Sequence, residues 1–324
     1  MMSSKHFKNI IISIAGIAVT NKCLCVVDAA SYPRNPDTSP PSIWRKMFQN
    51  FSRAKKTYHC SPFGISVFAV GWPRNKFRHA CNMLAQMLDN DMDGCADDPI
   101  VVSAIRSQKA GMAMFLNERD RNKYSRLVAD DFRYQDLQAD ETQLGCSGSG
   151  ETANCRDAAI EEIFHVISGP GISVAYAKKF GETNSLMTKS MDKARGGKFI
   201  TVPDKYPPDA IYHYYDKTCS YQCMATEYFY WAVTSFHHGQ NAREQDNMRE
   251  WEASTRGQLK SKVRDMFSLI IRRNKMKLLS AKGILPGTGS KIGAAGTYKP
   301  KRQKCASGCA LDGTKCGPLG GGGG

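Results

Sequence analysis

The segment from Asp157 to Ser168 constrains the fold more than any other part of the chain, because it sets three ionisable side chains among large apolar ones. Glu161 and His165 are four residues apart, so on a helix both project from one face. Glu162 lies about 100° further round such a helix. Burying charges of this kind is costly unless they are paired or bound to a metal ion. The segment therefore predicts a helix whose carboxylates and imidazole bind an ion or pair with other side chains. The large apolar residues around them are Ile160, Ile163, Phe164 and Ile167.

These residue types suit a zinc site. Zinc binds imidazole nitrogen and carboxylate oxygen, and a catalytic site keeps a fourth position for water. Glu161 and His165 would be ligands, and Glu162 would take the proton from the bound water. A third ligand is offered by Glu227, a lone acid in an expected helix from Met224 to Phe236 that is rich in aromatic residues. The simpler alternative keeps both neighbouring glutamates exposed and makes His165 a satisfied core residue.

The order E-E-x-x-H resembles the H-E-x-x-H helix of the zincin metallopeptidases, particularly those with a glutamate as third zinc ligand. The resemblance implies an α+β fold, a mainly helical domain with a small sheet. In such a fold the helix packs against a downstream helix carrying Glu227, beside an edge strand that aligns an extended substrate. Gly111–Leu116 or Asp131–Leu137 would be that strand.

Glu161 stands where the family has histidine, which leaves open an unusual ligand set, another divalent metal or an inactive site. Spare candidates for a ligand or for stabilising an oxyanion are His213, His237, His238, Tyr215 and Tyr228.

An acidic segment from Asp89 to Asp98 has the spacing of a calcium loop, with Gly94 at the tight turn. The residues expected to supply oxygen ligands to Ca²⁺ are Asp89, Asp91, Asp93 and Asp97. The segment resembles thrombospondin type 3 repeats and the first half of an EF-hand, although Ile100 stands where an EF-hand has its bidentate glutamate. We expect a calcium-bound loop that stabilises the fold as a staple would. The alternative is a solvated acidic turn between two helices.

The N-terminus predicts a secreted, extracellular protein. A basic start, an apolar run from Ile10 to Val19 and small residues up to Ala29 are typical of a signal peptide, which we take as residues 1–29. Its removal leaves ten cysteines, and an even number in a secreted chain favours disulfides over a cysteine metal site. The local pairs that the spacing allows are Cys146–Cys155 and Cys219–Cys223.

The domain is expected to span residues 30–285, followed by a basic, Gly/Cys-rich tail at 286–324. The net charge is +15, and residues 241–304 hold 16 Lys and Arg against five Asp and Glu. This basic C-terminal region favours polyanions as partners. The mature chain has no run of about 20 apolar residues that would span a membrane. It also has no recognisable nucleotide-binding loop or nucleic-acid module.

Two helix boundaries are also expected. Gly169-Pro170-Gly171 would end the helix that carries His165, and a long charged helix would run from Arg243 to about Ser280. Together the patterns predict a secreted zincin-like metal-dependent hydrolase that acts on extracellular peptides or proteins, with an inactive site left open. The alternative is a non-catalytic, calcium-stapled, disulfide-bonded interaction protein whose basic tail binds polyanions.

Overall fold

The computed structural model describes residues 39–90, 92, 94–144, 157–241, 249–271 and 298, together with the backbone of the C-terminal hairpin β5 (Cys309–Asp312) and β6 (Lys315–Pro318). The expected signal peptide, most of the expected tail and the pair Cys146–Cys155 lie outside the described residues. The expected domain boundaries therefore stay predictions.

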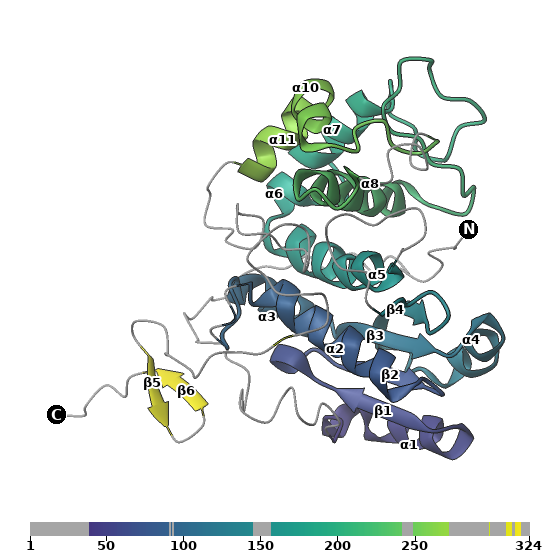
Figure 1. Ribbon diagram of the computed structural model, residues 1–324, viewed down its shortest axis with the longest axis vertical. Helices are drawn as coiled ribbons and strands as arrows, with labels where there is room; N and C mark the ends of the chain where they lie inside the picture. Colours follow the sequence, from purple (N-terminus) through teal and green to yellow (C-terminus); the bar gives the residue numbers. More distant parts are fainter. Residues whose placement is uncertain are drawn as a thin grey trace.

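A four-stranded sheet forms the lower layer of the molecule in Figure 1. Its strands, in spatial order, are β1 (Thr57–Cys60), β2 (Val67–Val70), β3 (Ala110–Phe115) and β4 (Arg133–Gln138). β1 runs antiparallel to β2, whereas β2, β3 and β4 are parallel neighbours. β4 is therefore an edge strand of this sheet. The strands expected at Gly111–Leu116 and Asp131–Leu137 are present as β3 and β4.

Helices predominate among the described residues, so the expected α+β, mainly helical fold with a small sheet is confirmed. The helices are α1 (Arg45–Ala54), α2 (Arg74–Leu88), α3 (Pro99–Ser107), α4 (Glu118–Tyr124), α5 (Ala158–Ile167), α6 (Ala177–Phe180), α7 (Leu186–Ala194), α8 (Tyr221–Phe236), α10 (Arg256–Lys262) and α11 (Arg264–Ile271). Short 3-10 turns are η1 (Ser42–Trp44), η2 (Pro62–Gly64) and η3 (Ser125–Leu127).

Alternate residues of the central strands pack on opposite faces of the sheet. Met112 and Met114 of β3 belong to a large core shared with α2, α3, α5 and α8. Ala113 and Phe115 belong to a smaller core formed with α1 and α4. The register pairs Met112 with Gln135 of β4. Gln135 therefore faces the large core, on the side of the sheet where α5 lies.

The helices that carry the predicted site are stacked above the sheet. α5 packs against β4, α8 packs against α5, and α7, α10 and α11 lie above α8 (Figure 1). This arrangement encloses the facing sides of α5 and α8 within one hydrophobic core.

The α-helical part of the site helix ends at Ile167, next to the expected stop at Gly169-Pro170-Gly171, but the helical path does not end there. α5 continues directly into η4 (Ser168–Ser173), a π-helical stretch that contains all three residues. A Cβ at Gly171 would lie 2.9 Å from both Val101 Cγ1 and Ile105 Cγ1 of α3. Glycine therefore serves close helix packing at this point rather than termination.

The expected continuous helix from Arg243 to Ser280 is also wrong within the described residues. Trp251 lies outside any helix and forms an isolated β-bridge. Thr255 then caps α10 through a capping box with Gln258, and Val263 separates α10 from α11. Four apolar residues of this segment are buried nonetheless, and these are Leu259, Val263, Met266 and Ile270.

Two disulfides are described. Cys60–Cys81 joins β1 to α2, and the expected local pair Cys219–Cys223 is confirmed at the start of α8. Disulfides are typical of oxidising compartments, while secretion itself stays a prediction. Within the described ranges no helix combines the length and apolarity needed to cross a membrane.

Candidate metal centre

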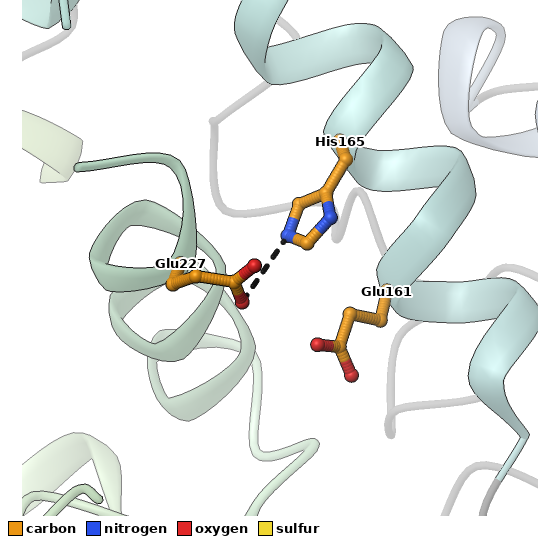
Figure 2. Close-up of side chains that lie close together, drawn as sticks. All are labelled: Glu161, His165 and Glu227. Carbon is orange, nitrogen blue, oxygen red and sulfur yellow. Dashed lines mark ion pairs between the residues drawn. The ribbon is translucent and has the colours of Figure 1, made fainter. Parts of the chain in front are cut away.

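α5 and α8 bring Glu161, His165 and Glu227 to one point, as the sequence predicted (Figure 2). One ligand atom from each residue lies within 4.8 Å of the other two. His165 Nε2 and Glu227 Oε2 are 3.6 Å apart across the two helices. Among the residues that the structure describes, this triad is the one group of acidic, cysteine or histidine side chains close enough to hold a metal ion.

Two members of the triad are buried, and the histidine makes no hydrogen bond at the nitrogen that faces Glu227. His165 is 2% exposed and Glu227 is 5% exposed. His165 Nε2 has no hydrogen-bond partner among the described residues, and the Glu227 carboxylate lies within ion-pair distance of it. A buried nitrogen without a partner costs free energy. A divalent cation would satisfy the nitrogen and offset the carboxylate charges, so the donor set fits a metal ion.

Burial and mutual charge shift both pKa values at this contact. Burial by itself lowers the pKa of His165, but the nearby carboxylates, led by Glu227, outweigh it and raise that pKa to about 9. Burial raises the pKa of Glu227 to about 8, against the opposing effect of His165. In the metal-free protein the contact between His165 and Glu227 therefore holds a proton at neutral pH, which a metal ion would displace.

Glu162 contacts the other nitrogen of the imidazole. Its Oε2 atom lies 3.6 Å from His165 Nδ1. The same oxygen accepts a short hydrogen bond from the side-chain amide of Gln135 on β4. Burial raises the pKa of Glu162, and the hydrogen bond and charge of His165 oppose that rise. Glu162 thus lies between the sheet and the imidazole.

The start of α5 is fixed by its N-cap residue. The side chain of Asp157 accepts a hydrogen bond from the Ala159 main-chain N–H at 3.1 Å. The other carboxylate oxygen of Asp157 pairs with His79 Nε2 of α2 at 2.6 Å. Both partners of this pair are buried. The cap therefore anchors the first turn of α5, which carries Glu161, to the neighbouring helix.

The start of α8 is fixed twice. Ser220 accepts a hydrogen bond from the Cys223 main-chain N–H at 3.3 Å, and the Cys219–Cys223 disulfide closes the same turn. Glu227 follows Cys223 by four residues, so it lies one turn further along the same face. Ring contacts then join α8 to α5, and these are Phe164–Phe229 at 5.5 Å and His165–Tyr230 at 5.9 Å between centroids.

Three polar side chains near the triad were not anticipated from the sequence: Gln135, Glu182 and Tyr214. Glu182 accepts a hydrogen bond from Thr226 Oγ1 at 3.2 Å, and burial raises its pKa, against the hydrogen bond from Thr226 and the charge of His165. Burial, followed by the charge of Glu227, raises the pKa of Tyr214. Gln135 could have been found from the sequence, because it is a polar residue on the side of an expected strand that faces the core. Glu182 lies in a loop, and its sequence context gives no comparable indication.

The spare candidates lie outside the triad. The Tyr228 hydroxyl hydrogen-bonds Ser190 of α7 at 2.8 Å, and Tyr215 is 47% exposed. The spare histidines His213, His237 and His238 are likewise not part of the metal-binding group.

The acidic loop is held by hydrogen bonds of its described acids. Asp89 Oδ2 accepts from the Gly94 main-chain N–H at 2.8 Å and from the Tyr298 hydroxyl at 2.6 Å. Asp97 Oδ2 accepts from the Asn90 main-chain N–H at 2.7 Å. The other two expected calcium ligands, Asp91 and Asp93, lie outside the described residues. Calcium binding therefore stays a prediction.

Comparisons with known protein families, with curated proteins and with solved structures found no match. The likeness to zincins therefore rests on the E-E-x-x-H helix and on the triad that it forms with Glu227.

Proposed function

We propose that this protein is a zincin-like metal-dependent hydrolase that cleaves peptide bonds, with Glu161, His165 and Glu227 holding one zinc ion. The observation that supports the proposal is the convergence of two carboxylates on the buried imidazole of His165, whose Nε2 atom makes no hydrogen bond among the described residues. When bound, zinc would acidify a water molecule and polarise the carbonyl of the substrate.

The remaining chemistry would come from side chains around the triad. Glu162 would accept the proton of the attacking water and pass it to the leaving amine. Tyr214 would donate a hydrogen bond to the oxyanion. Tyr214 is buried, and its pKa is raised by that burial and then by the charges of Glu227 and Glu161. Tyr228 is less suited, because its hydroxyl already bonds Ser190.

The edge strand β4 supports a peptide as the substrate. β4 pairs with β3 on one side, and its Gln135 side chain contacts Glu162 on α5. An extended peptide that added to the other edge of β4 would form main-chain hydrogen bonds and lie along the site helix. We propose extracellular peptides or proteins as the substrate class.

Metal analysis of the purified protein tests the proposal. We expect about one zinc ion per chain, together with hydrolysis of a mixed peptide substrate. Glu162→Gln should lose hydrolysis even at zinc concentrations that saturate the site, whereas Glu118→Gln, at a side chain 73% exposed on α4, should change neither zinc binding nor hydrolysis. Absence of any bound transition metal after zinc dialysis would falsify the metal site. Zinc binding without hydrolysis would reject the hydrolase alone.

A second candidate is a non-catalytic interaction protein, and the observation that favours it is Glu161 itself. A second carboxylate in place of an imidazole lowers the net charge around the ion and weakens its acidifying effect on water. In this candidate the basic tail at 286–324 binds polyanions. Salt-sensitive retention on heparin that is lost on deletion of the tail would support it, and retention unchanged by the deletion would reject the tail as the binding element.

For the acidic loop we propose a calcium staple. Calcium should raise the melting temperature of the wild-type protein, and the double variant Asp91→Ala with Asp93→Ala should abolish that rise. A rise of equal size in the double variant would reject this site.

A further inference from the structure

We infer that Gln135 and Glu162 are positioning residues that hold the His165 ring with Nε2 toward the metal position. The inference rests on the metal-binding part of the proposed function and adds a residue from the sheet to the site. It concerns the affinity of the site for metal and is separate from hydrolysis.

A continuous series of side-chain contacts leads from the sheet to the metal position. The Gln135 amide donates to Glu162 Oε2, and that oxygen lies 3.6 Å from His165 Nδ1. The opposite ring nitrogen, Nε2, lies 3.6 Å from Glu227 Oε2. The imidazole is therefore flanked by one carboxylate at each nitrogen, and the carboxylate at Nδ1 is attached to the sheet.

The strand register explains why a glutamine can reach this carboxylate. Gln135 pairs with Met112 and shares its face of the sheet, where α5 packs against β4. Gln135 is 5% exposed, so its amide is held in a buried position. Gln138, three residues along the same strand, projects from the other face. Gln138 is therefore a matched control, because it is a buried glutamine of the same strand that does not face α5.

A carboxylate at one imidazole nitrogen determines what the other nitrogen can do. It keeps a proton on the near nitrogen, so the lone pair for a metal is on the far nitrogen. Glu162 and His165 are three residues apart on α5, so they can face each other. The carboxylate alone is free to rotate about its side-chain bonds, whereas the Gln135 amide holds Oε2 beside Nδ1.

This role is compatible with proton transfer by Glu162. Both contacts fall on Oε2. A carboxylate has a second oxygen, and that oxygen would accept the proton of water. Gln135→Met separates the two roles, because it removes the amide donor and leaves the carboxylate in place.

The experiment measures zinc affinity by competition with a chromogenic chelator for wild-type, Gln135→Met and Gln138→Met protein. Loss of an outer partner of a ligand histidine weakens metal binding about 10- to 100-fold. We expect a loss of that size for Gln135→Met and less than about twofold for Gln138→Met. Melting curves of the metal-free proteins show whether each variant is folded.

Side-chain ¹⁵N spectra of His165 provide a readout that a general loss of stability would not produce. In zinc-loaded wild-type protein we expect a proton on Nδ1 and metal on Nε2. In metal-free Gln135→Met we expect more than one ring orientation, against one in the wild type. Equal zinc affinities for wild type and Gln135→Met, or one ring orientation in both metal-free proteins, would overturn the inference. A wild type that binds no zinc rejects the proposed function, and the metal-free spectra still decide whether the ring is held.

Discussion

His165 Nε2 faces Glu227 Oε2 at 3.6 Å across α5 and α8, although the two residues lie far apart in the sequence. Both side chains are buried, and Glu161 joins them from the preceding turn of α5. A proton and a metal ion would therefore compete for the same imidazole nitrogen. This competition makes the site testable without a known substrate.

Zinc should stabilise the folded protein. At a free zinc concentration about a hundred times the dissociation constant, binding adds about 2.7 kcal/mol to the free energy of unfolding. Glu227→Gln should abolish most of this gain, because it removes one anionic ligand from the triad. The measurement is urea unfolding with and without zinc.

Glu161→Gln provides an independent check in case Glu227→Gln folds poorly. It lies in the first turn of α5 and is half-buried, so its effect on the metal-free fold should be smaller. A zinc-dependent gain that is unchanged in both variants would contradict the triad as the binding site.

Zinc binding should release protons at neutral pH. The nearby carboxylates, led by Glu227, overcome the opposing effect of burial and raise the pKa of His165 to about 9. The proton must leave before Nε2 can bind metal. The apparent affinity for zinc should therefore fall as the pH drops below 9, up to about tenfold per pH unit for each proton displaced. Calorimetry in two buffers of different ionisation enthalpy counts the protons released. An affinity that is constant from pH 6 to pH 8 would contradict this coupling.

The triad could be predicted from sequence because its chemistry is local to two helices. Four-residue spacing places Glu161 and His165 on one face, and Glu227 is a lone acid among aromatic residues. Both facts are visible without tertiary information. The fold class was expected from the resemblance to the zincins, and the structure confirms an α+β, mainly helical fold with a small sheet.

The partners of the triad could not be predicted because they depend on register and packing. Gln135 reaches Glu162 because β4 pairs with β3 in one register and α5 packs on that face. The role of Gly171 has a similar origin, since glycine ends helices in many sequences but here lies within a π-helical turn and allows contact with α3. Sequence alone does not show whether a glycine ends a helix or allows two helices to pack closely.

Gly171→Ala should destabilise the protein. The added Cβ would lie 2.9 Å from Val101 Cγ1 and from Ile105 Cγ1, closer than packed carbon atoms approach. Overpacking of this kind costs about 1–3 kcal/mol. The double variant with Val101→Ala should lose less than the sum of the two single changes, because one clash is removed.

Gly257→Ala is the matched control for that change. Gly257 lies on α10, and the nearest atom to its added Cβ would be Thr255 Oγ1 at 3.9 Å. Alanine should stabilise α10 by about 0.5–1 kcal/mol, because glycine loses more backbone freedom in a helix. Denaturant unfolding measures both variants, and equal effects at the two glycines would contradict the packing explanation.

His237 should make the folded protein sensitive to mild acid. Burial, assisted by the charge of Arg256, lowers the pKa of His237 from 6.5 to about 3. Its Nε2 atom has no hydrogen-bond partner among the described residues. The unfolded chain therefore takes up a proton that the folded protein does not. This contribution to stability is fully present above pH 6.5 and is lost as the pH falls toward 3.

The test compares wild-type protein with His237→Phe. The variant keeps an aromatic ring beside Phe236 and removes the ionisable group. Between pH 6.5 and pH 5 the stability of the wild type should fall by about 1–2 kcal/mol relative to the variant. His238→Asn is the control, because residue 238 is exposed and asparagine accepts its positive φ of 66°. The charge of His238 is the smallest of the three causes that lower the pKa of His237, so the control should keep most of the wild-type pH dependence. A difference between wild type and His237→Phe that stays constant over this range would show that the imidazole is solvated in the folded protein.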